Sequence, residues 1–237
     1  MDSVLRDIDR EQLKMRGDVD NLYRHYEKLA GFVYQHLEQA TIEWARLVVS
    51  HPKAVLLVVE TTHIVGKHGY SLGGSEPIRL TTLSLANGEI WDQLLSPSLS
   101  ESVQGVEYHG LTRASLTGQP TINQAWPDIA EVLDGCHIII FNADYARSAL
   151  QTVYQTHMLD DAYCLHNKCK EYYREFYELS LEKVLSYQGI DKKRDELTDS
   201  HDRLLVLQQV MNNLAAGMTK QTFETLDSLG DLEDHPF

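Results

Sequence analysis

The spacing of hydrophobic positions changes near residue 50. Over residues 18–49 apolar side chains recur at steps of three and four, which predicts one face of an amphipathic helix. Gly17 predicts a break that separates a short first helix from this long one. Pro52 predicts the helix end, because a residue before proline avoids the helical region. We interpret residues 1–52 as an N-terminal helical arm, which either packs on the following domain or binds a protein partner, including a second copy.

After Pro52 short apolar runs alternate with helical patterns. Residues 54–60 and 136–141 are continuous runs rich in Val and Ile, typical of strands buried on both faces of a sheet. Asn87-Gly88 separates two apolar runs within 78–95 and is a strong hairpin signal. Further helices are predicted at 122–133, 142–157, 167–178, 180–188 and 199–216, with a short strand at 162–165. This order predicts an α/β fold over residues 53–217, with a mixed sheet flanked by helices.

Charge and cysteine content narrow the classes of function. The chain has 21 Lys and Arg against 35 Asp and Glu, a net charge of −14, and no segment is basic overall. This argues against tight, unaided binding of nucleic acid. Residues 218–237 are interpreted as an acidic tail. No stretch approaches the ~18 apolar residues of a membrane span, so no membrane partner is expected. Three cysteines, odd in number and sparse, favour a reducing compartment, and a cytoplasmic location is expected.

Four short motifs end the first buried strand, follow the hairpin, join the second buried strand to a helix and open the last long helix. They are Val-Val-Glu-Thr-Thr at 58–62, Tyr-His-Gly-Leu-Thr at 108–112, Phe-Asn-Ala-Asp-Tyr-Ala at 141–146 and Ser-His-Asp-Arg-Leu-Leu-Val at 200–206. In order and spacing they resemble the DnaQ-like (DEDDh) 3′–5′ exonuclease family, over about residues 53–216. The resemblance implies an RNase H-like fold. It also implies phosphodiester hydrolysis by two Mg²⁺ or Mn²⁺ ions on four carboxylates, with a histidine as general base.

The chain departs from this family at the catalytic positions. Of the residues that the family uses for catalysis, Glu60 and His201 remain. Apolar residues stand at the other three carboxylate positions, which are Val58, Ala146 and Val206. One carboxylate beside a histidine cannot neutralise two divalent ions. The sequence therefore predicts an inactive exonuclease-like protein that requires no cofactor.

The first of three functional hypotheses is a structural or regulatory subunit of a larger complex. Such a subunit keeps part of the family's groove for single-stranded DNA or RNA, which it binds weakly. The resemblance implies that the nucleic-acid contacts come from Thr61, Thr62, His109, Gly110 and Asn142.

The other two hypotheses belong to different classes. One is an active nuclease with a rearranged site, in which Glu60, Asp144 and Asp202, with His201 beside them, hold a single Mg²⁺ or Mn²⁺. The simpler interpretation of the two aspartates is that Asp144 stabilises a helix N-terminus and Asp202 is solvated. The other is a pure protein-binding scaffold that uses the helical arm as its interface.

Overall fold

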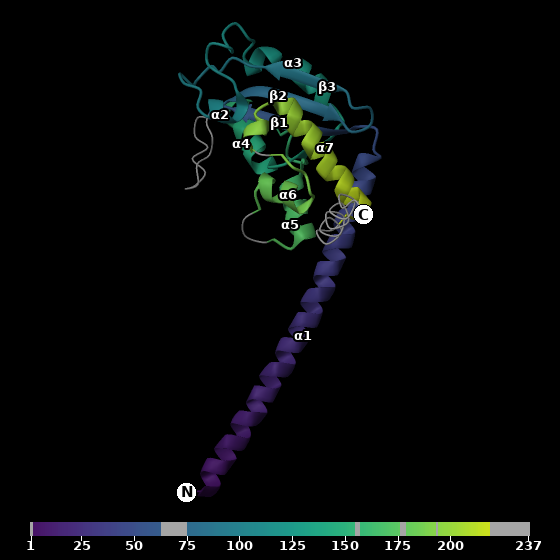
Figure 1. The fold of residues 1–237 in the computed structure, drawn as a ribbon. Coiled ribbons are helices and arrows are strands. Elements are labelled where there is room, and N and C mark those ends of the chain that lie inside the picture. Colours follow the sequence, from purple (N-terminus) through teal and green to yellow (C-terminus); the bar gives the residue numbers. More distant parts are fainter. Residues whose placement is uncertain (1, 63–74, 155–156, 176–178, 193, 219–237) are drawn as a thin grey trace, which may run out of the picture. The chain divides into compact units, whose positions relative to one another are not determined.

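The computed structural model describes residues 2–62, 75–154, 157–175, 179–192 and 194–218 (Figure 1). The helices are α1 (Asp2–Val49), α2 (Val106–His109), α3 (Ile122–Leu133), α4 (Ala143–Tyr154), α5 (Leu165–Tyr173), α6 (Leu181–Tyr187) and α7 (Ser200–Ala216), with a 3-10 turn at Arg194–Leu197. The strands are β1 (Ala54–Thr61), β2 (Pro77–Ser84), β3 (Ile90–Leu94), β4 (His137–Ile140) and β5 (Tyr163–Cys164). Apart from residue 218, the predicted acidic tail lies outside the described residues.

The five strands form one mixed sheet in the order β3-β2-β1-β4-β5. β1 is antiparallel to β2 and β2 is antiparallel to β3, which confirms the hairpin predicted from Asn87-Gly88. β1 is parallel to β4, with Val55 opposite Ile138, and β4 is parallel to β5. The predicted central position of residues 54–60 is therefore confirmed.

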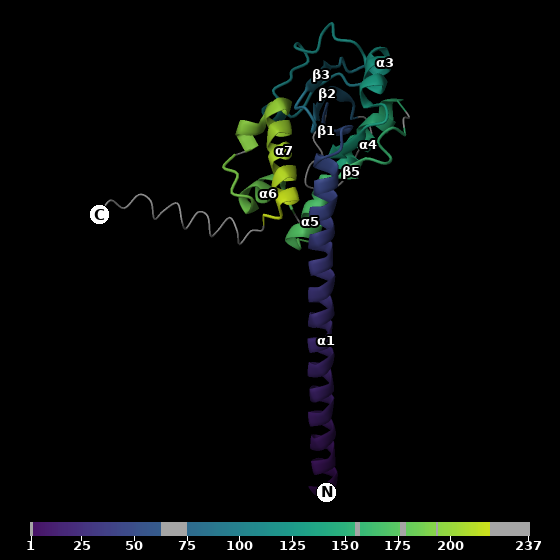
Figure 2. The same cartoon turned by 90° about the vertical axis from the view of Figure 1, so that its right-hand side faces the viewer.

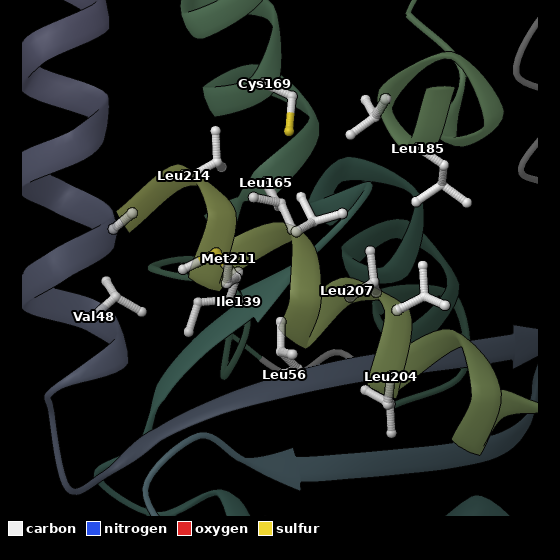
Figure 3. Packing of buried hydrophobic residues seen from close by; sticks show 14 of the residues in the cluster. Val48, Leu56, Ile139, Leu165, Cys169, Leu185, Leu204, Leu207, Met211 and Leu214 are labelled. Atoms are coloured by element: carbon white, nitrogen blue, oxygen red, sulfur yellow. The ribbon is translucent and has the colours of Figure 1, made fainter. Parts of the chain in front are cut away.

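Helices cover both faces of this sheet (Figure 2). Side chains alternate along β1, so Leu56 and Val58 join one buried cluster while Leu57 and Val59 join the other. The first cluster includes residues of α5, α6 and α7, and Figure 3 shows several of its members around α7. The second cluster is closed by α3 and α4. Burial on both faces explains why β1 is a nearly continuous apolar run.

The chain divides into two compact units, Met1–Ala40 and Thr41–Phe237. Helix α1 runs through Gly17 without interruption, so the predicted break there is wrong. One glycine costs a helix only ~1 kcal/mol, which the helix formers around it outweigh. The unit boundary falls inside α1, because Ile42, Ala45 and Val48 are buried in the core of the second unit. The arm boundary expected at residue 52 lies just after the end of α1. Burial of α1 in the second unit begins about ten residues earlier, near Ile42.

The last turns of α1 are also tied to α7 within the second unit. The Arg46 guanidinium donates through Nε to the Ala215 carbonyl oxygen over 2.8 Å, which satisfies a helix-end acceptor. In the described part of the chain, no helix combines the length and the apolar composition that a membrane span requires.

Candidate functional site

A cavity of about 320 Å³ lies where β1 and β4 end. Because these neighbouring strands are parallel, their carboxyl ends meet at the same edge of the sheet, where α/β proteins place their ligands. Side chains from α2, α4, α6 and α7 complete the wall. Six of the residues singled out in the sequence lie on this wall, namely Val58, Glu60, Thr61, His109, Asn142 and Ala146.

The buried carboxylate of Glu60 is held by two side chains from the first turn of α7. Ser200 Oγ donates to Glu60 Oε1 over 2.8 Å, and the Arg203 guanidinium forms an ion pair with the same oxygen. The Glu60 side chain is 8% exposed and that of Arg203 is 20% exposed. The charge of Glu60 is thus matched by a guanidinium of the protein itself.

Sequence reasoning missed Arg203. It lies three residues after Ser200, and such a spacing places two side chains on one face of a helix. An arginine on the first turn of the helix that follows the family's last motif was the available signal.

The three apolar replacements do not converge on one point. Val58 and Ala146 line the cavity, on β1 and α4 respectively. Val206 is buried in the cluster beneath α7, and it is not part of the cavity wall. Two of the three positions at which the resemblance implies carboxylates therefore give the cavity an apolar surface.

His201 lies on a different side of the first turn of α7 from Arg203. Its Nε2 is 3.8 Å from Asp92 Oδ2 on β3, and the residue does not line the cavity with Glu60. Asp92 also accepts hydrogen bonds from Nε and Nη2 of Arg79, over 2.7 and 2.9 Å, and from Thr81 Oγ1 over 2.8 Å. Burial raises the pKa of Asp92, but these hydrogen bonds and the Arg79 charge outweigh it and leave the pKa below its ordinary value.

His109 lines the cavity with both of its ring nitrogens already in use. Its Nδ1 accepts from the Leu111 N–H over 3.0 Å. An acceptor Nδ1 leaves Nε2 to donate, and Nε2 lies 2.9 Å from the Gln104 carbonyl oxygen. Gly110 closes this turn at φ +70°, a conformation that favours glycine. His109 thus presents its ring, and no free nitrogen, to a ligand.

The threonines that follow Glu60 are also engaged within the protein. The Thr61 hydroxyl is hydrogen-bonded to the Tyr145 hydroxyl. Burial raises the pKa of Tyr145, although its hydrogen bonds oppose the shift. Thr62 Oγ1 accepts from the Glu76 N–H over 3.0 Å and lies 3.2 Å from Ser100 Oγ. These contacts fasten the end of β1 to α4 and to the loop near residue 100.

Glu76 is a second buried carboxylate close to this edge of the sheet. It accepts hydrogen bonds from the Ser98 N–H and hydroxyl and from the N–H groups of Leu99 and Ser100. Burial raises its pKa, but these bonds to the charged form outweigh burial and lower the pKa below its ordinary value. Among the described residues, these neutral donors and no cation stabilise the charge of Glu76.

The two aspartates of the rearranged-site hypothesis do not approach Glu60. Asp144 is exposed and forms an ion pair with Arg147 over 2.7 Å, while Asp202 is exposed on α7. Among the described residues, no group of three or more His, Cys, Asp or Glu side chains is arranged to hold a metal ion. The side chains around the cavity do not fit the family's two-metal centre, because they supply one carboxylate that already has a cation.

Comparison with known proteins identifies the fold. No family model matches the sequence, and no curated protein does. Solved structures do match, first a 3′-exonuclease in 3′-end-specific recognition of a histone mRNA stem-loop. Its TM-score is 0.57 at 11% identity, over 71% of this chain and 65% of that one. The second is the nuclease domain of 3′hExo, a DEDDh family member bound to rAMP, with a TM-score of 0.54 at 13% identity over 71% and 94% of the two chains.

The chain has the DnaQ-like exonuclease fold. A full-length 3′-exonuclease matches at a TM-score of 0.52 and 12% identity, over 72% of this chain and 63% of that one. The predicted RNase H-like mixed sheet is thus confirmed. The chain spans slightly less than two thirds of the first of these exonucleases, and identities this low establish the fold alone.

Proposed function

We propose that this chain is a catalytically inactive exonuclease-like protein that serves as a structural or regulatory subunit of a larger complex. The observation that supports the proposal most directly is the ion pair between Glu60 and Arg203 in the cavity. The expected location of the protein stays the cytoplasm.

The positive charge of Arg203 in its ion pair with Glu60 opposes metal binding in the cavity. A divalent ion that approached Glu60 would meet a fixed positive charge and would have to displace it. The displaced guanidinium would then be partly buried without its partner, which costs several kcal/mol. Val58 and Ala146 offer no oxygen in compensation. We therefore propose that the metal-free state is the functional one.

Weak binding of single-stranded DNA or RNA is the second part of the proposal. Tyr108, Phe141 and Tyr145 contribute aromatic surface to the cavity wall, and Asn142 contributes an amide. Aromatic faces stack on nucleobases of any sequence, which suits an unpaired end. The net charge of −14 opposes contact with phosphates, so the affinity is expected to be low and to depend little on added salt.

A metal-dependent nuclease assay tests the proposal. Purified wild-type protein is expected to show no hydrolysis of single-stranded DNA or RNA above background with Mg²⁺ or Mn²⁺. The matched control is Glu60→Gln, purified identically, whose background must equal that of the wild type. Hydrolysis that disappears in Glu60→Gln or in His201→Ala would overturn the proposal in favour of a rearranged active site.

A gain-of-function variant sharpens the test. Val58→Asp with Ala146→Asp places carboxylates at the two family positions that line the cavity, and Val206 is left unchanged because it is buried outside the cavity wall. We expect Mn²⁺ affinity, measured by calorimetry, to rise only when Arg203→Ala is added, because Arg203 competes for Glu60. Equal affinity with and without Arg203 would show that the ion pair does not exclude metal.

A further inference from the structure

In the first unit of the chain, Met1–Ala40, the described residues belong to helix α1 and carry an uncovered apolar stripe. Leu22, Tyr26, Leu29 and Val33 are 70%, 67%, 66% and 51% exposed. Their steps of four, three and four residues place them on one line along the helix. A stripe of large apolar side chains in water is typical of an interface.

The spacing of the stripe indicates the kind of surface that covers it. In the sequence, positions 5, 8, 12, 15, 19, 22, 26, 29 and 33 are apolar except for Gln12, and their steps alternate strictly between three and four. This is a heptad repeat of 3.5 residues, which differs from the 3.6-residue period of a helix lying on a globular surface. Only another long helix presents holes at the same spacing. The repeat ends where the next position is His36.

The described part of this chain has no second helix that could serve. The next longest, α7, has 17 residues, and its apolar face is buried in the core of the second unit. A second copy of the chain supplies a helix of identical length and spacing. In a parallel pair the two-fold axis runs along the helices. Every layer then meets itself, Leu22 against Leu22 and Leu29 against Leu29.

The flanking positions favour the parallel orientation. With Tyr26 and Val33 at position a, Phe32 falls at position g and Leu37 at position e of the next heptad. In parallel coiled coils position g of one helix lies beside that e position of its neighbour. Phe32 is 72% exposed in the single chain, and this arrangement covers it with the Leu37 side chain of the second copy.

We propose that residues 5–33 form a parallel two-stranded coiled coil with the same segment of a second copy of this chain. The inference does not rest on the proposed function, since a dimer would form with an active or an inactive cavity. A symmetric pair would give the protein two exonuclease-like units.

The oligomeric state of the full-length chain tests the proposal. Sedimentation equilibrium is expected to give twice the chain mass for the wild type. Leu22→Glu with Leu29→Glu is expected to raise the dissociation constant at least ~100-fold, because it buries unpaired carboxylates at the interface. The matched control is Asn21→Glu with Gln35→Glu, which adds the same charge at exposed positions off the stripe and should change the constant less than ~3-fold.

Disulfide cross-linking tests the orientation of the two helices. It does not require the variant with Leu22→Glu and Leu29→Glu to fold. Tyr26→Cys is expected to cross-link to its own copy under mild oxidation, while Arg24→Cys, on the opposite side of the helix, is not. A wild-type monomer at micromolar concentration would overturn the proposal. So would a dimer that survives Leu22→Glu with Leu29→Glu, or equal cross-linking through positions 24 and 26.

Discussion

Two buried carboxylates near the same edge of the sheet are stabilised in different ways. Glu60 lies in the cavity, where its charge is matched by the Arg203 guanidinium. Glu76 lies beside Thr62, where its charge is shared among the N–H and O–H donors of residues 98–100. A carboxylate with neutral donors keeps a net negative charge in its surroundings, whereas one with a guanidinium does not. In the described part of the chain, the charge of Glu60 is thus matched by a guanidinium, whereas that of Glu76 is not.

For these two carboxylates, the position in the sequence does not indicate the role in the structure. Glu60 lies where the resemblance implies a catalytic carboxylate, and it has the contacts of a structural ion pair. Glu76 belongs to none of the four motifs and accepts hydrogen bonds from three backbone N–H groups and one hydroxyl. The type of partner, more than burial, decides which of the two could still accept a cation.

The largest expected effect comes from Arg203→Met. It leaves Glu60 buried without its cation and is expected to destabilise the second unit by about 3 kcal/mol at pH 7. Adding Glu60→Gln should recover most of this loss, because the uncompensated charge is then removed. Urea unfolding of both single variants and the double variant measures the coupling. If the double variant is as unstable as Arg203→Met alone, the guanidinium acts through packing and the comparison fails.

A smaller effect is expected from Glu76→Gln, about 2 kcal/mol at neutral pH, because one amide oxygen replaces a carboxylate that accepts several hydrogen bonds. The lowered pKa of Glu76 sets the pH dependence. Its contribution is fully present above the ordinary value of 4.5 and is lost as pH falls through the lower pKa of the folded state. The stability difference between wild type and variant should therefore shrink from pH 7 to pH 3. A difference that grew at low pH would contradict this account.

The smallest effect is expected from Asp144→Asn, less than about 1 kcal/mol, because the side chain is 73% exposed and its ion pair with Arg147 is screened by water. The same variant should leave Mn²⁺ binding unchanged in calorimetry. A clear loss of metal affinity would instead make Asp144 a ligand and would favour the rearranged-site hypothesis.

Much of the fold could be predicted from the sequence. β1 and β4 are buried on both faces, so they read as uninterrupted apolar runs, and Asn87-Gly88 fixed the hairpin. Glu60 lines the cavity because it lies near the end of β1, and the end of a strand is easy to locate in a sequence. The extent of the arm was harder, since burial of residues 41–49 depends on contacts with distant parts of the chain.

The arrangement on α7 could not be predicted from motif spacing. Each residue turns a helix by about 100°, so an error of one or two residues in the helix start decides which side chain faces the cavity. The structure starts α7 at Ser200, with Asp199 as its cap. Ser200 and Arg203 then reach Glu60 while His201 lies near Asp92. His201 therefore has the sequence position that the resemblance implies, but its side chain lies near Asp92 and does not line the cavity.

The contact of α1 with α7 has a consequence for how the protein is made. Residues 41–49 leave the ribosome well before the helix that completes their cover, Ser200–Ala216. Arg46 cannot meet Ala215 until α7 has been synthesised. Until then the apolar side of this segment stays exposed, and exposed apolar surface promotes aggregation. The second unit therefore closes as a whole only after α7 has emerged, and a ribosome that stalls before α7 leaves an exposed core.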